Sequence, residues 1–183
     1  MKILTGALKG RTIAYKPNPH LRPTADKTRK AIFDMLQGQF EGKTVLDLFS
    51  GTGALGFEAL SQGADRVTFV ESEKSQALSI KRNLTDLGLS GKSKVIAADA
   101  IRSIEKLSRD GDPFDFILMD PPYDTGLGER TLSALLKSDI LKKDTLIILE
   151  CRDSKKLPDA GAQLTALRDK SYGDARIVIY RHV

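Results

Sequence analysis

Short apolar runs alternate with helical segments from residue 44 to residue 150 of this 183-residue chain. Five runs have the length and the Val, Ile and Phe content of buried strands, and a stretch with helical spacing follows each of the first four. We predict strands at residues 44–49, 66–71, 94–98, 114–119 and 145–150, and helices at 54–62, 73–87, 100–109 and 129–136. Because parallel strands need a crossover between them, usually a helix, this alternation predicts an α/β protein with a parallel sheet.

The pattern changes after Cys151. Residues 163–168 and 176–182 are strand-like and flank the turn sequence Ser171-Tyr172-Gly173-Asp174, which predicts an antiparallel hairpin. The hairpin brings the predicted sheet to seven strands, mostly parallel, with helices on both faces.

The first 43 residues differ from the rest of the chain in their charge. They hold nine Lys and Arg residues against three acids, whereas the remaining residues carry 20 basic and 21 acidic groups. Such a segment can follow nucleic acid phosphates, but a solvated basic face explains charge alone equally well. Here we predict a short β-hairpin at 2–5 and 11–15 and a helix from residue 24 or 26 to 37. We therefore divide a single domain into a basic extension, 1–43, and a core, 44–183.

Composition excludes several classes of protein. Hydrophobic residues make up 40% of the chain and charged residues 29%, as in globular proteins. The single cysteine cannot form an internal disulfide or a thiolate cage, and the two isolated histidines do not indicate a metal site. No apolar run approaches the ~20 residues of a membrane span, and the N-terminus has no signal-peptide pattern. We expect a cytoplasmic monomer without a metal.

A glycine-rich loop follows the first predicted strand of the core. Gly51, Gly53 and Gly56 spell G-x-G-x-x-G, and Glu71 ends the next predicted strand. Glycines permit a tight turn and let backbone N–H groups approach a ligand at a helix N-terminus. A carboxylate at the second strand end can accept hydrogen bonds from ribose hydroxyls. The loop predicts a nucleoside-containing cofactor, and both nicotinamide dinucleotides and S-adenosylmethionine (SAM) fit it.

Two further acids refine this prediction. Asp47, four residues before the first glycine, would repel a pyrophosphate but suits the cationic methionine end of SAM. Asp99 follows the third predicted strand and can either accept from an adenine amino group or cap the helix that begins at Ala100. The two roles of Asp99 are compatible.

The sequence Asp120-Pro121-Pro122-Tyr123 comes directly after the apolar run at 114–119. The prolines fix the backbone and hold an acid and an aromatic ring rigidly at a strand end. The exocyclic amine of a purine is a poor nucleophile, because its lone pair is delocalised into the ring. Hydrogen bonds from the amine to Asp120 and to the Pro121 carbonyl would orient that lone pair toward a methyl group, and Tyr123 would stack on a base taken out of its helix.

With these motifs the chain resembles the class I SAM-dependent methyltransferases, and Asp-Pro-Pro-Tyr resembles the motif of those that methylate exocyclic amines. Lys9-Gly10-Arg11 and the run Leu-Arg-Pro-Thr-Ala-Asp-Lys-Thr-Arg at 21–29 extend the similarity to the RsmD-type family of small-subunit ribosomal RNA guanine-N2 methyltransferases. The resemblance covers essentially the whole chain. It implies a Rossmann-like methyltransferase fold, SAM as the cofactor, and one guanine of 16S ribosomal RNA, within an assembling small subunit, as the substrate.

The predicted site contains three sets of residues. The catalytic set is Asp120, Pro121, Pro122 and Tyr123. The cofactor-binding set is Asp47, Phe49, Ser50, Gly51, Gly53, Glu71, Asp99, Ala100 and Asp120. The RNA-binding set is Lys9, Arg11, Arg22, Lys27, Arg29 and Lys30.

Other functions explain parts of this pattern. An adenine-N6 methyltransferase acting on DNA or RNA shares Asp-Pro-Pro-Tyr, but ~40 residues before the sheet leave little room for a DNA-reading domain. A protein-amide methyltransferase has no use for the basic segment. A nicotinamide-dependent oxidoreductase needs neither Asp47 nor Asp-Pro-Pro-Tyr. A non-enzymatic RNA-binding protein needs neither the cofactor-binding loop nor Asp-Pro-Pro-Tyr.

Overall fold

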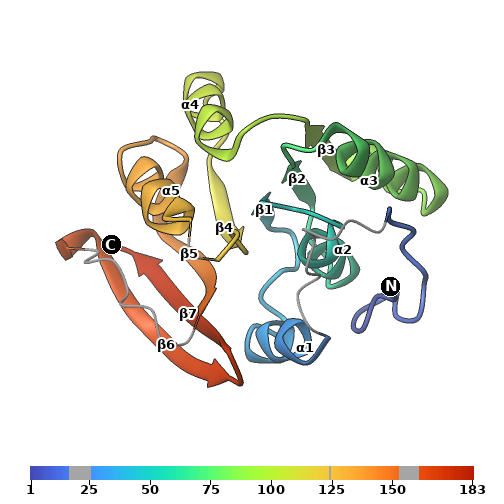
Figure 1. Ribbon diagram of the computed structural model, residues 1–183, viewed down its shortest axis with the longest axis horizontal. Coiled ribbons are helices and arrows are strands. Elements are labelled where there is room, and N and C mark those ends of the chain that lie inside the picture. Colours follow the sequence, from blue (N-terminus) through green and yellow to red (C-terminus); the bar gives the residue numbers. More distant parts are fainter. Residues whose placement is uncertain (17–25, 124, 153–160) are drawn as a thin grey trace.

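Central strands with apolar side chains on both faces require helices on both sides of the sheet. The computed structural model describes residues 1–16, 26–123, 125–152 and 161–183 and has this layered arrangement (Figure 1). Helices α1, α2 and α3 share a hydrophobic core with one face of the sheet, and α4 and α5 share a second core with the other. The helices are α1 (Asp26–Met35), α2 (Ala54–Ser61), α3 (Lys74–Asp86), α4 (Ala100–Asp110) and α5 (Leu127–Leu136), with short 3-10 helices at Ser90–Lys92 and Gly161–Gln163.

The sheet has seven strands in the order β3-β2-β1-β4-β5-β7-β6. Strands β1 to β5 pair in parallel, and β7 runs antiparallel between β5 and β6. The predicted fold class is thereby confirmed. The strands are β1 (Thr44–Leu48), β2 (Arg66–Val70), β3 (Ser93–Ile96), β4 (Phe114–Met119), β5 (Leu141–Arg152), β6 (Leu164–Tyr172) and β7 (Ala175–His182).

The strand order reverses beside β1. The chain adds β2 and β3 on one side of β1 and then returns to add β4 on the other. In open α/β sheets such a reversal forms a crevice at the carboxyl ends of the strands, where ligands bind. The side chains that follow β1 and β4 are therefore the first place to look for a site.

Most predicted elements agree with the structure to within a residue or two at each end. Strand β5 is longer than predicted because Leu141 pairs with Phe114 across a register irregularity. Strand β6 also continues beyond residue 168, through Tyr172, so the turn narrows to Gly173, with φ 65°, and Asp174.

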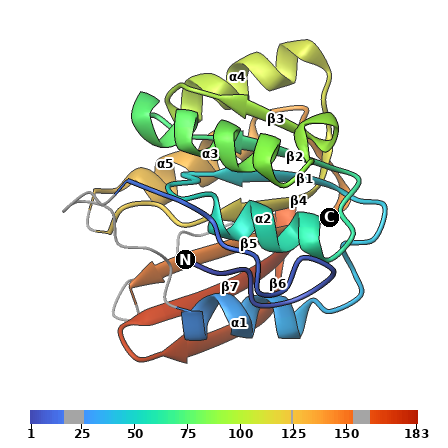
Figure 2. The same cartoon turned by 90° about the vertical axis from the view of Figure 1, so that its right-hand side faces the viewer.

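The predicted N-terminal hairpin is present in a short form. An antiparallel bridge pairs Lys2 with Thr12, and the Ile3 N–H donates to the Arg11 carbonyl at 3.0 Å. The hairpin is also anchored to α2, because the N–H of Leu4 donates to Glu58 at 2.7 Å. Figure 2 shows this segment lying along α1 and α2.

In the part of the chain that the structure describes, no helix has the length and apolar character needed to cross a bilayer. The same residues contain no group of three or more His, Cys, Asp or Glu side chains arranged to hold a metal ion.

Candidate active site

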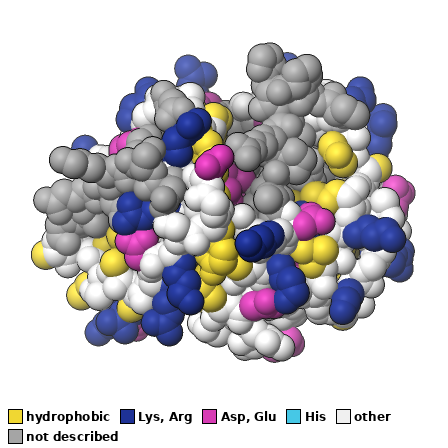
Figure 3. Space-filling model, turned by 60° about the horizontal axis from the view of Figure 1, so that its bottom comes forward, with side chains coloured by type: hydrophobic (Ala, Val, Ile, Leu, Met, Phe, Trp, Pro, Cys, Tyr) yellow, Lys and Arg dark blue, Asp and Glu magenta, His cyan; other side chains and the backbone are white. Residues whose placement is uncertain are grey.

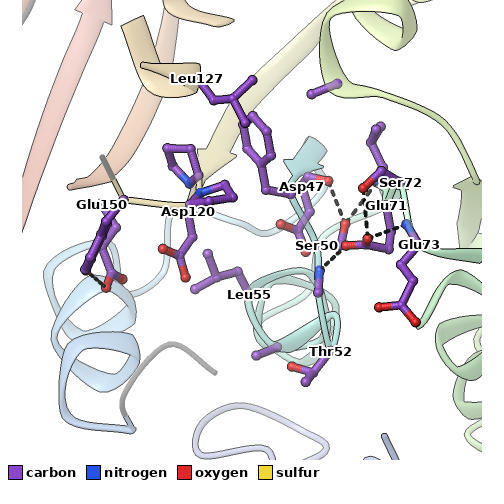
Figure 4. Close-up of a pocket in the computed structure, with 18 of the residues that line it drawn as sticks. Asp47, Ser50, Thr52, Leu55, Glu71, Ser72, Glu73, Asp120, Leu127 and Glu150 are labelled. Atoms are coloured by element: carbon purple, nitrogen blue, oxygen red, sulfur yellow. Dashed lines mark hydrogen bonds between the residues drawn. The ribbon is translucent and has the colours of Figure 1, made fainter. Parts of the chain in front are cut away.

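Four strands bring acidic side chains to the same edge of the sheet. Asp47 belongs to β1, Glu71 follows β2, Asp120 follows β4 and Glu150 lies near the end of β5. All four line one pocket with a volume of about 590 Å³. Asp47 lies in the middle of this pocket, with Asp120 and Glu150 on one side and Glu71 on the other (Figure 4). The pocket therefore occupies the crevice that the strand order predicts.

The predicted cofactor-binding residues gather at this pocket with one exception. Those that line it are Asp47, Phe49, Ser50, Gly51, Glu71, Asp99, Ala100 and Asp120. Gly53 is not among the lining residues but caps the N-terminus of α2, with a φ of 81°. A Cβ atom there would lie 2.9 Å from the ring of Phe57, so this position requires glycine for both conformation and space.

The loop after β1 has an unusual backbone held in place by its neighbours. Phe49 has a φ of 62°, in the left-handed region that bulky side chains avoid. The next residue, Ser50, fixes the loop, because its hydroxyl donates to the Asp47 carbonyl at 2.7 Å and accepts from the Val70 N–H at 3.0 Å. Strained backbone of this kind concentrates at functional sites.

Close packing of α2 on the sheet depends on Gly56. A Cβ atom there would lie 2.2 Å from the ring of Phe69 and 2.9 Å from Oδ2 of Asp47. Without it, the Gly56 N–H donates to the same Asp47 oxygen at 3.0 Å. The third glycine of the motif thus serves helix–strand packing and also positions the buried acid.

The pKa of Asp47 is strongly perturbed by its surroundings. Burial, reinforced by the nearby carboxylates of Asp120 and Glu71, raises its pKa to about 8, although the Gly56 N–H opposes the shift. In the ligand-free site this side chain therefore holds a proton at pH 7. A cation beside it would favour the ionised form.

Two other strand-end acids are tied to the backbone. Each oxygen of the Glu71 carboxylate accepts from a backbone N–H at 2.7 Å, Oε2 from Gly51 and Oε1 from Glu73. Asp99 caps α4, because its Oδ1 accepts from the N–H groups of Ile101 and Arg102. The capping role predicted for Asp99 is confirmed, and its contact with adenine stays a prediction.

The segment 120–123 is held between α5 and β5. Pro121 is buried against α5, where Gly128 approaches so closely that a Cβ atom would lie 3.2 Å from the proline ring. The Tyr123 hydroxyl donates to Oε1 of Glu150 at 3.0 Å, and the guanidinium of Arg152 lies 5.6 Å from the centre of the tyrosine ring. Two residues of the neighbouring strand β5 thus hold the aromatic ring in place.

Sequence reasoning missed several residues of the pocket. They are Thr52, Ala54, Leu55, Val70, Ser72, Glu73 and Ala98 near the glycine loop and the ends of β2 and β3, Thr28 of α1, Leu127 of α5, Glu150 of β5, and Tyr172, Asp174 and Ala175 around the turn between β6 and β7. The strand-end rule applied to the other acids would have found Glu150, which closes a predicted strand. No local sequence pattern indicates that residues of α1 or of the turn between β6 and β7 line the pocket, because these elements are distant in the chain from the other pocket residues.

The pocket lining favours a cationic ligand over an anionic one. Its described residues include seven acids, from Asp47 to Asp174, and no Lys or Arg. A pyrophosphate would meet these carboxylates without a compensating cation, whereas a sulfonium and an ammonium group would be stabilised by them. The site therefore fits SAM and disfavours a nicotinamide dinucleotide.

The predicted RNA-binding residues divide into exposed and buried ones. Lys9, Arg11, Lys27 and Lys30 are exposed, and Arg22 falls outside the described residues. On the face that carries α1, Lys and Arg side chains form several groups with acidic side chains among them (Figure 3). No compact basic patch is visible on that face among the described residues.

The prediction for Arg29 was wrong. Its side chain is only 1% exposed, its Nε lies 3.2 Å from Oε1 of Glu58, and its Nη2 donates to the Lys2 carbonyl at 2.9 Å. A guanidinium that is buried and paired inside the protein cannot contact a phosphate. Arg29 instead ties α1 to α2 and to the N-terminal segment.

Comparison with known proteins gives consistent matches over the whole chain. The family model described as "Conserved hypothetical protein 95" matches residues 1–181. "Ribosomal RNA small subunit methyltransferase D" of Haemophilus influenzae is 33% identical over 183 residues, covering 99% of this chain and 92% of the relative. The protein of the same name from Escherichia coli K12 is 31% identical over 181 residues, covering 99% and 89%. The solved structure "Putative methyltransferase yhhF" from Escherichia coli has a TM-score of 0.87 at 30% identity and covers 100% of this chain and 97% of that one.

Proposed function

Since the chain belongs to the family of Conserved hypothetical protein 95, the RsmD-type methyltransferases, we propose that it is a SAM-dependent methyltransferase of small-subunit ribosomal RNA. Its target in this proposal is the exocyclic N2 amine of one guanine in 16S ribosomal RNA. The observation that carries the proposal is that the glycine loop and the Asp-Pro-Pro-Tyr segment open into the same acidic pocket.

The chain's own residues suit the binding of this cofactor. The loop from Phe49 to Gly51 and the carboxylate of Glu71 would hold the nucleoside, and Asp47 would face the cationic methionine portion. When bound, SAM supplies an electrophilic methyl group on a sulfonium. The side chains of Leu55 and Leu127 line the same pocket and help to exclude water from it.

Asp120 and its neighbours would prepare the amine. The carboxylate of Asp120 and the carbonyl of Pro121 accept the two amine hydrogens, which points the nitrogen lone pair into the pocket. Tyr123, fixed by its hydrogen bond to Glu150, offers its ring as a stacking surface for the base. No strong general base is required, because the methylated ammonium loses its extra proton readily.

Helix α1 links the pocket to the basic N-terminal segment. Thr28 lines the pocket, while its neighbours Lys27 and Lys30 are exposed. Phosphates of an RNA whose base enters the pocket would therefore pass these lysines. Lys9 and Arg11 complete the proposed contact surface, together with Arg22. We assign the protein to the cytoplasm as a monomer that acts on an assembling small subunit.

The test is a single-turnover transfer from labelled SAM to small ribosomal subunits purified from cells that lack the enzyme. We expect N2-methylguanine in 16S ribosomal RNA, identified by mass spectrometry, and binding of SAM but not NAD in titration calorimetry. The Asp120→Ala variant should transfer the methyl group about 100-fold more slowly or worse, by analogy with the loss of other preorganised hydrogen-bonding groups. N6-methyladenine as the product, or near-normal turnover by the variant, would overturn the substrate or the mechanism respectively.

A further inference from the structure

Glu150 is a buried carboxylate that lies beside Asp120, with 5% of its surface exposed. Met119 and Leu149 pair directly across β4 and β5, and Asp120 and Glu150 are the residues that follow them. Side chains alternate along a strand, and the Met119–Leu149 pair belongs to the core under α4 and α5. Asp120 and Glu150 therefore project together from the opposite face, on strands about 4.8 Å apart.

The same carboxylate supports the aromatic ring of the motif. Oε1 of Glu150 accepts the hydroxyl of Tyr123 at 3.0 Å. A carboxylate has about four acceptor sites, so this hydrogen bond does not exhaust it. Glu150 thus contacts the tyrosine on which a base would stack and lies beside the acid that would accept hydrogen bonds from the amine of that base.

Guanine and adenine, the two candidate target bases, differ at the ring atom next to the exocyclic amine. The Watson–Crick edge of guanine presents an N1–H donor beside the N2 amine, whereas adenine presents an N1 lone pair beside the N6 amine. A second carboxylate next to the amine acceptor matches the guanine edge and repels the adenine edge. A site built to bond a donor strongly rejects an analogue that lacks it, because its buried acceptor is left unpaired.

We propose that Glu150 is the residue that selects guanine, by accepting the N1–H of the target base while Asp120 accepts its amine. The inference rests on the proposed function and adds to it the atom by which guanine is distinguished.

The experiment compares two bases at the nucleotide that the wild-type enzyme methylates. Small subunits are reconstituted with ligated 16S ribosomal RNA that carries either guanine or 2-aminopurine at this position. 2-Aminopurine keeps the N2 amine, but its N1 is an acceptor. Wild-type protein should prefer guanine by about 10- to 100-fold in kcat/KM. Glu150→Gln should reduce this preference by about tenfold, since a glutamine amide carries both a donor and an acceptor and serves either base.

Tyr123→Phe is the matched control for a role confined to supporting the ring. It removes the hydrogen bond to Glu150 but leaves the carboxylate, so it should slow both substrates and keep the preference for guanine. Because the readout is a ratio of two substrates for one protein sample, partial unfolding of a variant cancels.

The outcomes separate the inference from the function on which it rests. An unchanged preference in Glu150→Gln, with wild-type protein still methylating guanine, would overturn the role of Glu150 alone. Methylation of adenine by the wild-type protein would overturn the proposed function, and the inference with it.

Discussion

The raised pKa of Asp47 makes SAM binding depend on pH in a predictable direction. Burial beside Asp120 and Glu71 raises this pKa to about 8, so the ligand-free protein holds a proton on Asp47 at neutral pH. A sulfonium in the pocket favours the ionised carboxylate, and binding should therefore release that proton. With a pKa of about 8, lowering the pH from 7 to 6 should weaken SAM binding by about tenfold, or about 1.4 kcal/mol.

Titration calorimetry measures this effect directly. The dissociation constant is determined at pH 6, 6.5 and 7, in buffers with different ionisation enthalpies, so that proton release appears in the observed heat. Asp47→Asn is the control, because it keeps the shape of the side chain and removes the titration. A wild-type affinity that does not change with pH, without proton release, would show that Asp47 does not face the cation.

Three further variants test the packing and the surface. Gly56→Ala should destabilise the protein by about 1–3 kcal/mol in urea unfolding, because its Cβ atom collides with the sheet; an unchanged midpoint would refute this account of the motif. Arg29→Met should cost about 3–5 kcal/mol of stability, because Glu58 loses its buried partner, yet it should leave the salt dependence of RNA binding unaltered. Replacing both Lys27 and Lys30 by Ala should leave the stability unchanged but weaken the salt dependence of RNA binding. The slope of log binding constant against log salt concentration should become smaller by roughly 0.7–0.9 for each lost phosphate contact. An unchanged slope would mean that these lysines are solvated and do not contact phosphates.

The sequence predicts the sheet and one half of the pocket well, because both depend on local order. Apolar runs of strand length mark the strands, and any polar residue that follows such a run falls at the same edge. Glu71 and Asp120 were found in this way, and Asp47 was found by its position four residues before the first glycine. The same rule also places Glu150 at this edge, but only the structure shows that it contacts Tyr123.

The errors come from partners that are distant in the chain. Arg29 belongs to a basic run, although helical spacing places it on the same face of α1 as Ile32 and Phe33. Its burial follows from Glu58, which lies on the next helix. The attachment of the N-terminal hairpin to α2 was not predicted for the same reason, since Glu58 and Ser61, which accept hydrogen bonds from its backbone, are distant in the chain. The spacing of residues shows which side chains share a face of a helix or strand, but it does not show which element packs against that face.

The attachment of the first residues to α2 and α3 has a consequence for the order in which the chain acquires its structure. Leu4 and Thr5 bond to Glu58, and Ala14 exchanges two hydrogen bonds with Asn83, so the partners are 53 to 69 residues away in sequence. During synthesis these acceptors emerge well after the segment that needs them. Contacts of such long separation also form late, because the intervening loop must close first. We therefore expect the residues that are made first to reach their final positions last, after the glycine loop and α2 have formed.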